Sequence, residues 1–307
     1  MPATFPQRLT LGCLSAILPA LIFLAVAGQF AAAQSDPPIP TGSIRIHYFR
    51  PDGNYLGWTV YAFGDTTEPN NYGTGPVTVT GTDSFGAYFD VSVISGAANV
   101  GIILHKGNTK DPGPNEYVDP ATQGNEYWQL SGSGVLQTTQ PPTIQATDPP
   151  IPSGKVRIHY FRPDKDYGAW SVYAWGAGDD GDNWCSTEDY VSGYDAYGAY
   201  YDVGVNPAWN GGQLGFIIHN CQTGIKDPGP NQYLQVTQYS QAWVLSGALS
   251  VFTAQPVTEY STDPAIPTGY ARIHYYRPDG DYAGWSLYPF GATSDPTGNW
   301  CVTEDYV

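Results

Sequence analysis

Ile46-His47-Tyr48-Phe49-Arg50-Pro51-Asp52 is the stretch that decides the fold, because it occurs three times in the chain. It returns as 158–164 and, with Tyr in place of Phe at the fourth position, as 273–279. His47, His159 and His274 mark the three copies, which are 112 and 115 residues apart. This period is the size of one independent all-β domain and is too long for a stacked solenoid repeat. The chain is therefore predicted to be a string of similar, separate modules.

The residues around the repeated stretch alternate as those of a strand do. Ile44, Ile46 and Tyr48 share one face, and a turn signal follows at 50–54. Further strands of the first copy are expected near 58–63, 87–93, 100–105 and 127–130. No segment after the first 33 residues shows the 3.6-residue period of an ordinary helix. We therefore expect an all-β fold of tandem two-sheet sandwiches.

The composition supports this fold class and narrows the choice of partner. Aromatic residues make up 14% of the 307 residues, beside 36 Gly and 27 Pro, a mix typical of short strands joined by tight turns. The chain has 12 Lys and Arg against 28 Asp and Glu, a net charge of -16 at pH 7. That charge repels phosphate backbones and anionic membranes, so neither nucleic acid nor lipid is expected as a partner. A neutral or cationic ligand fits better.

The first 33 residues have the pattern of an export signal. Arg8 provides the positive start, 9–27 is apolar, and 31–33 is a run of Ala that offers a cleavage site. The alternative is an uncleaved membrane anchor, because the apolar stretch is long, but Pro19 and the Ala ending favour cleavage. The mature chain is therefore expected to be secreted, either extracellular or periplasmic, and to have no membrane contact after cleavage.

Strings rich in Pro and Thr precede the copies and suggest the domain boundaries. The expected order is a signal peptide at 1–33, a leader at 34–40, a module at 41–137, a linker at 138–152, a module at 153–252, a linker at 253–267 and a truncated module at 268–307. The third copy stops before the later landmarks of the first two. Such a piece leaves strand edges unpaired, so we do not expect it to fold well alone. The chain is predicted to be a fragment of a longer protein.

The expected second strand of every copy carries two aromatic residues at alternate positions. The pairs are Tyr61 and Phe63, Tyr173 and Trp175, and Tyr288 and Phe290. Such residues project from the same face, about 7 Å apart, while Trp58 and its counterparts Trp170 and Trp285 face the other way as core candidates. Flat rings stack on the apolar face of a sugar, and polar side chains bind its hydroxyls. The pairs are predicted to bind sugar, with burial of both strand faces as the alternative.

Taken in order, these motifs resemble the family 41 carbohydrate-binding module, also called the bacterial pullulanase-associated domain. The resemblance rests on the repeated stretch, on Trp58 and its following aromatic residues, on 85–88 (Phe-Gly-Ala-Tyr) and on 110–114 (Lys-Asp-Pro-Gly-Pro). It covers nearly all of 41–136 and 153–251, and the truncated 268–307. It implies immunoglobulin-like β-sandwiches that bind α-glucans such as pullulan, amylopectin and glycogen, and that usually precede a family 13 glycoside hydrolase domain.

The resemblance also implies which side chains contact sugar. The stacking pair of the family, usually two Trp, falls on the three aromatic pairs. Its hydroxyl-binding Lys falls on Lys110 and Lys226, and its partner carboxylate falls on Asn115 and Asn231. The two Asn residues depart from the family pattern, since an amide binds hydroxyls without charge assistance. We therefore expect weaker binding at each site, which two linked modules on one polymer offset.

The mature chain has three cysteines, and two of them are expected to pair. Cys185 and Cys221 are both missing from the first copy, which indicates a Cys185–Cys221 disulfide that stabilises the second module by about 3–4 kcal/mol. Cys301 matches Cys185, and its partner would lie beyond residue 307. No Cys or carboxylate recurs with metal-ligand spacing, so no metal site and no cofactor are expected. The acidic run at 179–183 is expected to be a solvated turn.

The sequence as a whole predicts a non-catalytic chain that binds α-glucan. We expect a downstream catalytic domain, a secreted pullulanase-type hydrolase, which this chain targets to its substrate. No serine-hydrolase, zinc-protease or P-loop motif occurs. Two alternatives remain open. One is a structural or adhesive array of sandwich domains, in which the rings serve packing or protein contacts. The other is an enzyme within this chain that hydrolyses glycosidic bonds with paired carboxylates.

Overall fold

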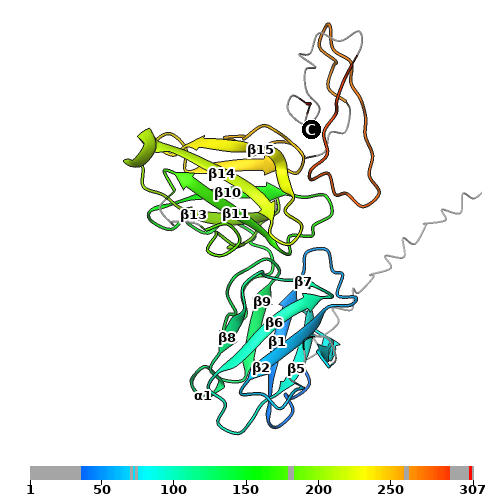
Figure 1. The fold of residues 1–307 in the computed structure, drawn as a ribbon, viewed down its shortest axis with the longest axis vertical. Coiled ribbons are helices and arrows are strands. Elements are labelled where there is room, and N and C mark those ends of the chain that lie inside the picture. The colour runs from blue at the N-terminus through cyan, green and yellow to red at the C-terminus, as the bar shows by residue number, and fades with distance from the viewer. Residues whose placement is uncertain are drawn as a thin grey trace, which may run out of the picture. The chain divides into compact units, whose positions relative to one another are not determined.

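The structure is a computed structural model that describes residues 36–69, 72, 75–178, 183–258, 263–290 and 304–305. Within these ranges the chain forms two complete β-sandwich modules, module 1 and module 2, followed by the third copy (Figure 1). The predicted signal peptide at 1–33, Cys301 and most of the acidic run at 179–183 lie outside the described residues. No helix in the described part of the chain is long and apolar enough to cross a membrane.

Module 1 consists of two facing sheets. The first has the order β4 (Gly81–Thr82), β5 (Ala87–Ser92), β1 (Ser43–Phe49) and β9 (Glu126–Leu130). The second has the order β3 (Val77–Thr78), β2 (Thr59–Gly64), β6 (Val100–Lys106) and β7 (Thr109–Lys110), with β8 (Glu116–Val118) also paired to β6 and the short helix α1 (Pro120–Gln123) after it. All five strands predicted for this copy are confirmed. The short strands β3, β4, β7 and β8 were not predicted.

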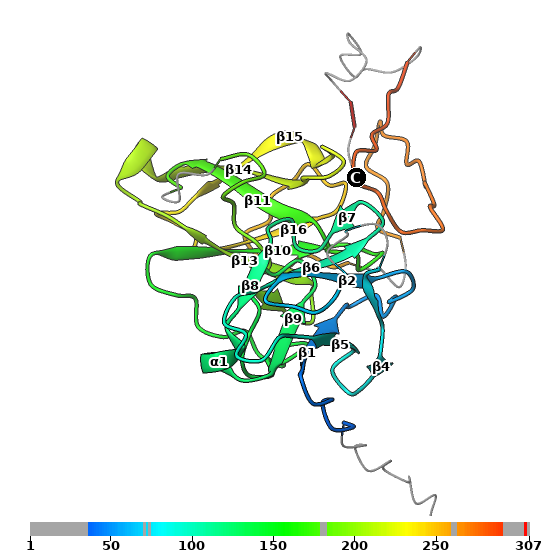
Figure 2. The same cartoon turned by 60° about the horizontal axis from the view of Figure 1, so that its bottom comes forward.

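Module 2 repeats this arrangement. One sheet has the order β12 (Gly193–Tyr194), β13 (Ala199–Gly204), β10 (Lys155–Phe161) and β16 (Gln241–Leu245), and the other has β11 (Trp170–Gly176), β14 (Gln213–Asn220) and β15 (Lys226–Gln235). A 3-10 turn, η1 (Trp209–Gly212), precedes β14. Figure 2 shows β16 beside β10, and the two strands pair in parallel, as β9 and β1 do. The repeated stretch thus supplies the strand that lies between an antiparallel and a parallel neighbour in each module.

The inward faces of the two sheets form the core of module 1. Ile46 and Tyr48 of β1 are fully buried, and Trp58, Val60 and Ala62 face them from the second sheet with at most 5% exposure. These are the residues that the period-2 pattern places on one face of each strand, so the predicted inward faces are confirmed. Burial of such side chains stabilises the module by about 1.5–3 kcal/mol for each large apolar residue.

The outward face of β1 is also covered, by polar contacts. Arg45 forms a bidentate ion pair with Asp90, with distances of 2.7 and 2.8 Å. His47 lies between carboxylates, since its Nδ1 is 2.5 Å from Asp83 and its ring stacks on Trp128 with centroids 5.1 Å apart. The equivalent contacts of β10 repeat in module 2. His47 and His159 therefore have structural partners in the two modules.

Asp111, within the motif at 110–114, is a buried structural hub. Its carboxylate accepts hydrogen bonds from the hydroxyls of Tyr48 and Ser131 and from the backbone N–H of Gly132. Asp227 of module 2 has the equivalent partners, with Ser246 Oγ and the N–H of Gly247 both 2.6 Å away. A fully buried carboxylate needs such donors to remain in the interior. The Asp of this motif thus holds the ends of several strands together.

The third copy does not form a sandwich in the described residues. Residues 263–290 contain no strand, and the only pairing within the described part of this copy is a bridge between Leu287 and Asp305. Ile273 is 63% exposed, whereas Ile46 and Ile158 at the same position are fully buried. The sequence at 268–307 lacks counterparts of β5 and β9, the two neighbours of β1. Among the described residues of this copy, the repeated stretch therefore has no strand to pair with.

Candidate functional site

The predicted aromatic pairs lie on the outward faces of β2 and β11. Tyr61 and Phe63 are half-buried and their rings stack with centroids 5.7 Å apart and planes 20° from parallel. Tyr173 and Trp175 are likewise half-buried, with centroids 5.9 Å apart. The intervening residues point into the core. The sequence therefore alternates rings and small or β-branched residues so that each strand is buried on one face and carries a row of rings on the other.

The rings lie flat because the neighbouring strand has Gly beneath them. Phe63 covers Gly101 of β6, and Trp175 covers Gly215 of β14. Both glycines lie directly across from the ring-bearing residues in the antiparallel register. Gly is unusual inside a strand and marks a place where another group approaches the backbone closely. The two positions hold each ring against the sheet, with its outer face directed away from the core.

The predicted polar residues make different contacts in the two modules. Lys110 donates a hydrogen bond from Nζ to Oδ1 of Asn115, at 3.0 Å. In module 2, Lys226 pairs with His219 in the β-ladder, and its Nζ lies 5.6 Å from the ring centroid of Trp184. Asn231 is exposed on β15. Thus the structure brings Lys110 and Asn115 together, and it places Lys226 beside an aromatic ring.

Two further rings extend each row, and the sequence analysis missed them. In module 1 the Tyr72 ring meets Tyr61 at 5.3 Å, and the Tyr117 ring meets Phe63 at 5.6 Å. In module 2 their places are taken by Trp184, 5.3 Å from Tyr173, and Tyr233, 6.1 Å from Trp175. Aromatic residues at matching positions of both copies were the available signal. They fall outside the predicted strands, so alternation gave no indication of them.

The third copy does not arrange its pair in this way. Tyr288 and Phe290 belong to no strand among the described residues, and Phe290 is 82% exposed. The described part of this copy has no strand beneath the two side chains to hold them in a row.

Cys185 and Cys221 form the predicted disulfide, with their Cα atoms 5.4 Å apart. Glu188 and His219 lie beside them, so that one ligand atom from each of the four residues falls within 4.8 Å of the others. Sulfurs joined in a disulfide are not thiolates, which are the form that binds a metal. Glu188 is occupied as well, since both of its carboxylate oxygens lie 2.9 Å from Nε2 of His219. The cluster is therefore a structural unit in this state.

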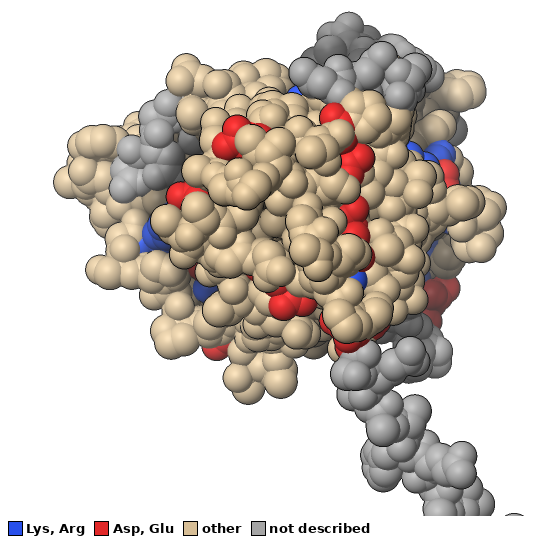
Figure 3. All heavy atoms as spheres, turned by 90° about the horizontal axis from the view of Figure 1, so that it is seen from below, with Lys and Arg blue, Asp and Glu red and all other residues tan. Residues whose placement is uncertain are grey.

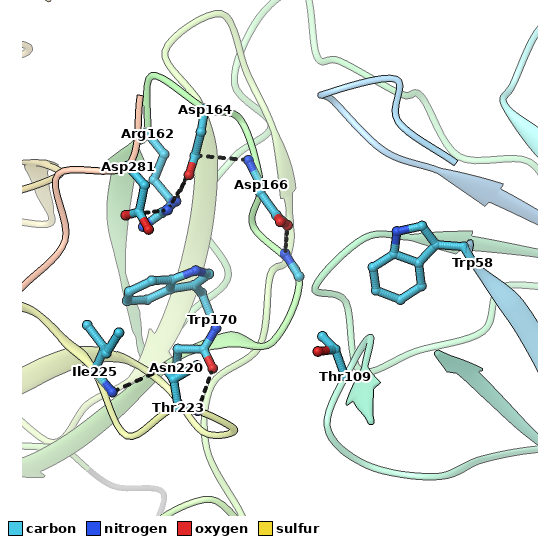
Figure 4. A pocket seen from close by; sticks show the side chains of 11 residues that line it. Trp58, Thr109, Arg162, Asp164, Asp166, Trp170, Asn220, Thr223, Ile225 and Asp281 are labelled. Carbon is cyan, nitrogen blue, oxygen red and sulfur yellow. Dashed lines mark hydrogen bonds and ion pairs between the residues drawn. The ribbon is translucent and has the colours of Figure 1, made fainter. Parts of the chain in front are cut away.

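The cavity in Figure 4 is a separate feature of about 230 Å³. Trp58 and Trp170 line it, but each is only 5% exposed. The Arg162 guanidinium lies 4.4 Å above the Trp170 ring and forms ion pairs with Asp164 and Asp281. Because these rings are covered and the cations are already paired, the cavity does not offer an open stacking surface to a sugar.

The charged groups around the modules are mostly paired or scattered. On the face seen in Figure 3, several acidic side chains form a column and others lie in small groups among uncharged ones, while basic side chains form only small separate patches. This face therefore offers no continuous basic surface to a polyanion. The rings and the amide or ammonium groups beside them suit an uncharged, hydroxyl-rich ligand.

The fold and the rows of rings define the class of protein: a tandem of β-sandwich modules that carry rows of aromatic rings on an outward strand face. The profile of the family described as "Bacterial pullanase-associated domain" matches residues 42–138, 154–253 and 269–305. These segments make up most of the chain, which belongs to this family. The resemblance seen in the sequence is thereby confirmed.

Curated relatives carry the same kind of segment within longer proteins. The chain is 37% identical over 75 residues to an alpha-amylase of Streptomyces lividans, and this match covers 24% of this chain and 8% of that protein. It is 27% identical over 242 residues to Pullulanase A of Streptococcus pneumoniae serotype 4, and this match covers 76% of this chain and 17% of that protein. The chain therefore spans less than a fifth of the length of either relative.

Solved structures include similar modules. One, described as "Alpha-glucan recognition by family 41 carbohydrate-binding modules from streptococcal virulence factors", is 20% identical and covers 69% of this chain and 97% of that chain, with a TM-score of 0.30. A family 26 module of Eubacterium rectale Amy13K in complex with maltoheptaose is also 20% identical and covers 70% of this chain and 98% of that chain, with a TM-score of 0.25.

Proposed function

We propose that the chain binds α-glucan polysaccharide through the ring rows of its two complete modules. The observation that carries this proposal is the row itself: Tyr173 and Trp175 lie half-buried on the outward face of β11, and Gly215 of the neighbouring strand lies beneath the larger ring. A soluble domain gains nothing in its own core from rings on this face. Stacking on the apolar face of a pyranose uses them, since it buries the C–H groups of the sugar against the rings.

The polar groups complete the site in this proposal. In module 1, Nζ of Lys110 and Oδ1 of Asn115 lie 3.0 Å apart, and together the two groups offer donors and an acceptor to hydroxyls at the rim of a sugar. Lys226 and Asn231 have these roles in module 2. Because Asn115 and Asn231 are neutral, each site binds moderately, and the two sites act together on one polymer through their high effective concentration.

The relatives of the chain support a proposal for its biological role. The relatives named above are an alpha-amylase and a pullulanase, enzymes several times longer than this chain. We infer that the modules hold a linked pullulanase-type hydrolase on starch, glycogen or pullulan outside the cell. In this role the modules themselves are non-catalytic.

Affinity gel electrophoresis of the whole chain tests the proposal. Pullulan or amylopectin in the gel should retard the chain. In a variant in which Tyr61 and Phe63 are already Ala, the further changes Tyr173→Ala and Trp175→Ala should remove most of the remaining retardation. Tyr239→Ala, which removes an exposed ring outside the row, is the control and should migrate as the parent does.

The same experiment separates the alternatives. A structural or adhesive array would migrate unretarded in every gel, and that result would overturn the proposal. An enzyme within the chain would release new reducing ends from pullulan, which the proposed function does not predict.

A further inference from the structure

Trp184 extends the row of rings in module 2 beyond the strand that carries the pair. Its ring stacks on that of His219, with centroids 3.8 Å apart and planes 17° from parallel, and it meets Tyr173 at 5.3 Å and 63°. Nevertheless, 44% of the residue remains exposed. A large ring that is fixed from one side and open to solvent on another has the properties of a sugar-stacking group.

The turn that carries Trp184 is held from several directions. Cys185 has a positive φ of 58°, a conformation that a residue with a side chain rarely adopts without support. The support comes from the disulfide to Cys221 and from Glu188, which accepts the backbone N–H of Cys185 at 2.7 Å. Glu188 also accepts a hydrogen bond from Ser171 Oγ, at 2.5 Å. The disulfide and Glu188 therefore fix the residue that directly follows Trp184.

Module 1 provides the comparison. Tyr72 occupies the same place, with its ring 4.5 Å from that of His105, but the copy has no Cys at either position. The third copy repeats the pattern of module 2 in its sequence, as Trp300-Cys301, and Ser286 donates to Glu304 as Ser171 donates to Glu188. A Trp at this place thus occurs together with the Cys, and the smaller Tyr occurs without it.

We propose, on the basis of the proposed glucan binding, that Trp184 is a third sugar-stacking ring of module 2 and that the Cys185–Cys221 disulfide is its positioning device. The planes of Trp175, Tyr173 and Trp184 turn by 32° and then 63° along the row. A flat ribbon such as a β-1,4-glucan cannot stack face-on upon all three rings at these angles. An α-1,4-glucan curves, so three consecutive glucose units can each meet one ring. The site therefore selects curved segments of three or more units.

The test uses the whole chain with Tyr61→Ala and Phe63→Ala, so that oligosaccharide binding reports module 2. Isothermal titration with maltotriose and with maltoheptaose compares Trp184→Ala, Cys185→Ser with Cys221→Ser, and the control Tyr239→Ala. One aromatic contact is worth about 0.5–1.5 kcal/mol, which corresponds to about two- to tenfold in affinity. Trp184→Ala should weaken maltoheptaose binding by this factor and maltotriose binding less, because the shorter sugar can shift to the remaining pair.

Like Trp184→Ala, the disulfide variant should lose more affinity for maltoheptaose than for maltotriose. Tyr239→Ala should match the parent for both sugars. Equal losses for both sugars in Trp184→Ala would mean that Trp184 only supports Tyr173, and this result would overturn the third ring. If the variant without the disulfide bound both sugars as the parent does, that result would overturn the positioning role of Cys185 and Cys221. If the parent binds neither sugar, or if Trp175→Ala binds both sugars as the parent does, the proposed function itself fails. Either outcome differs from the two above.

Discussion

A Cβ atom added to Gly215 would lie 2.2 Å from Cε2 of Trp175, closer than two non-bonded carbon atoms can approach. Gly101 has the same relationship with Phe63, since an added Cβ would lie 2.2 Å from Cζ of that ring. Neither glycine has a positive φ, so the reason for Gly at these positions is space and not backbone conformation. The flat position of the rings is thus encoded on the neighbouring strand.

Gly215→Ala is expected to lift or turn the indole of Trp175 and to weaken oligosaccharide binding to module 2 about as much as Trp175→Ala does. Overpacking at such a site costs about 1–3 kcal/mol if the ring cannot move, but Trp175 lies at the surface and can move. We therefore expect a large loss of affinity with a small fall in melting temperature. Titration calorimetry and thermal unfolding of the whole chain measure the two effects. Unchanged affinity in Gly215→Ala would show that the flat pose is not needed.

Asn115 offers a gain of affinity. Asn115→Asp places a carboxylate 3.0 Å from Nζ of Lys110, where an amide oxygen now lies. Charge-assisted hydrogen bonds are about twice as strong as neutral ones, although exposure of the residue reduces the effect. In a chain whose module 2 rings are replaced by Ala, we expect maltoheptaose to bind about two- to fivefold more tightly, and Asn115→Ala to bind more weakly than the parent. An Asp variant weaker than the parent contradicts this role.

Asp111 allows the structural part of its motif to be separated from the binding part. Asp111→Ala leaves the buried hydroxyls of Tyr48 and Ser131 and the N–H of Gly132 without their acceptor. The expected cost is about 3–5 kcal/mol in the free energy of unfolding. Lys110→Ala, one residue earlier, should change stability by less than about 0.5 kcal/mol and affect sugar binding instead. Chemical denaturation followed by circular dichroism tests the contrast, and similar stability of the two variants would disprove it.

Sequence reasoning succeeded where one physical period determines the outcome. The alternation along 44–49 and 58–63 predicts which residues of β1 and β2 share a face, because strand geometry allows only one arrangement. It leaves open whether the face of Tyr61 and Phe63 is exposed or buried. The joint absence of two Cys from the first copy predicts the disulfide, since a bonded pair is lost together. These features depend on local geometry or on comparison between copies.

Other features depend on how distant segments meet. Trp184 lies in a turn, and only its contacts with His219 and Tyr173 show that it joins the row. The sheet order, in which β9 joins β1 in parallel, also has no local signature. Similarly, the burial of Arg45 and His47 depends on partners 45 and 36 residues away in the chain. Contacts between segments that are distant in the chain leave no local pattern in a single sequence from which they could be predicted.

Glu116 gives module 1 a pH dependence that module 2 lacks at the same position. Burial, and to a lesser extent the negative charge of Asp111, raises the pKa of Glu116 to about 8, and its Oε1 has no hydrogen-bond partner among the described residues. Module 2 has the neutral Gln232 there, also buried. Because the pKa in the folded state is higher than the unfolded value of 4.5, the contribution of Glu116 to stability is fully present below pH 4.5 and is lost as the pH rises through about 8.

Glu116→Gln should therefore raise the melting temperature of module 1 at pH 9 and leave it nearly unchanged at pH 4. Thermal unfolding of the whole chain at several pH values measures the difference between variant and parent, so that other titrating groups cancel. Gln232→Glu is the reciprocal variant, and it should introduce a loss of stability above pH 4.5 into module 2. A parent and a Glu116→Gln variant whose melting temperatures differ by the same amount at pH 4 and pH 9 would show that the buried carboxyl does not titrate in this range. If the predicted divergence appears, β8, the strand that carries Tyr117, contains a protonated carboxyl at neutral pH. The row of rings in module 1 then includes a ring whose strand weakens in alkali, while the row in module 2 does not.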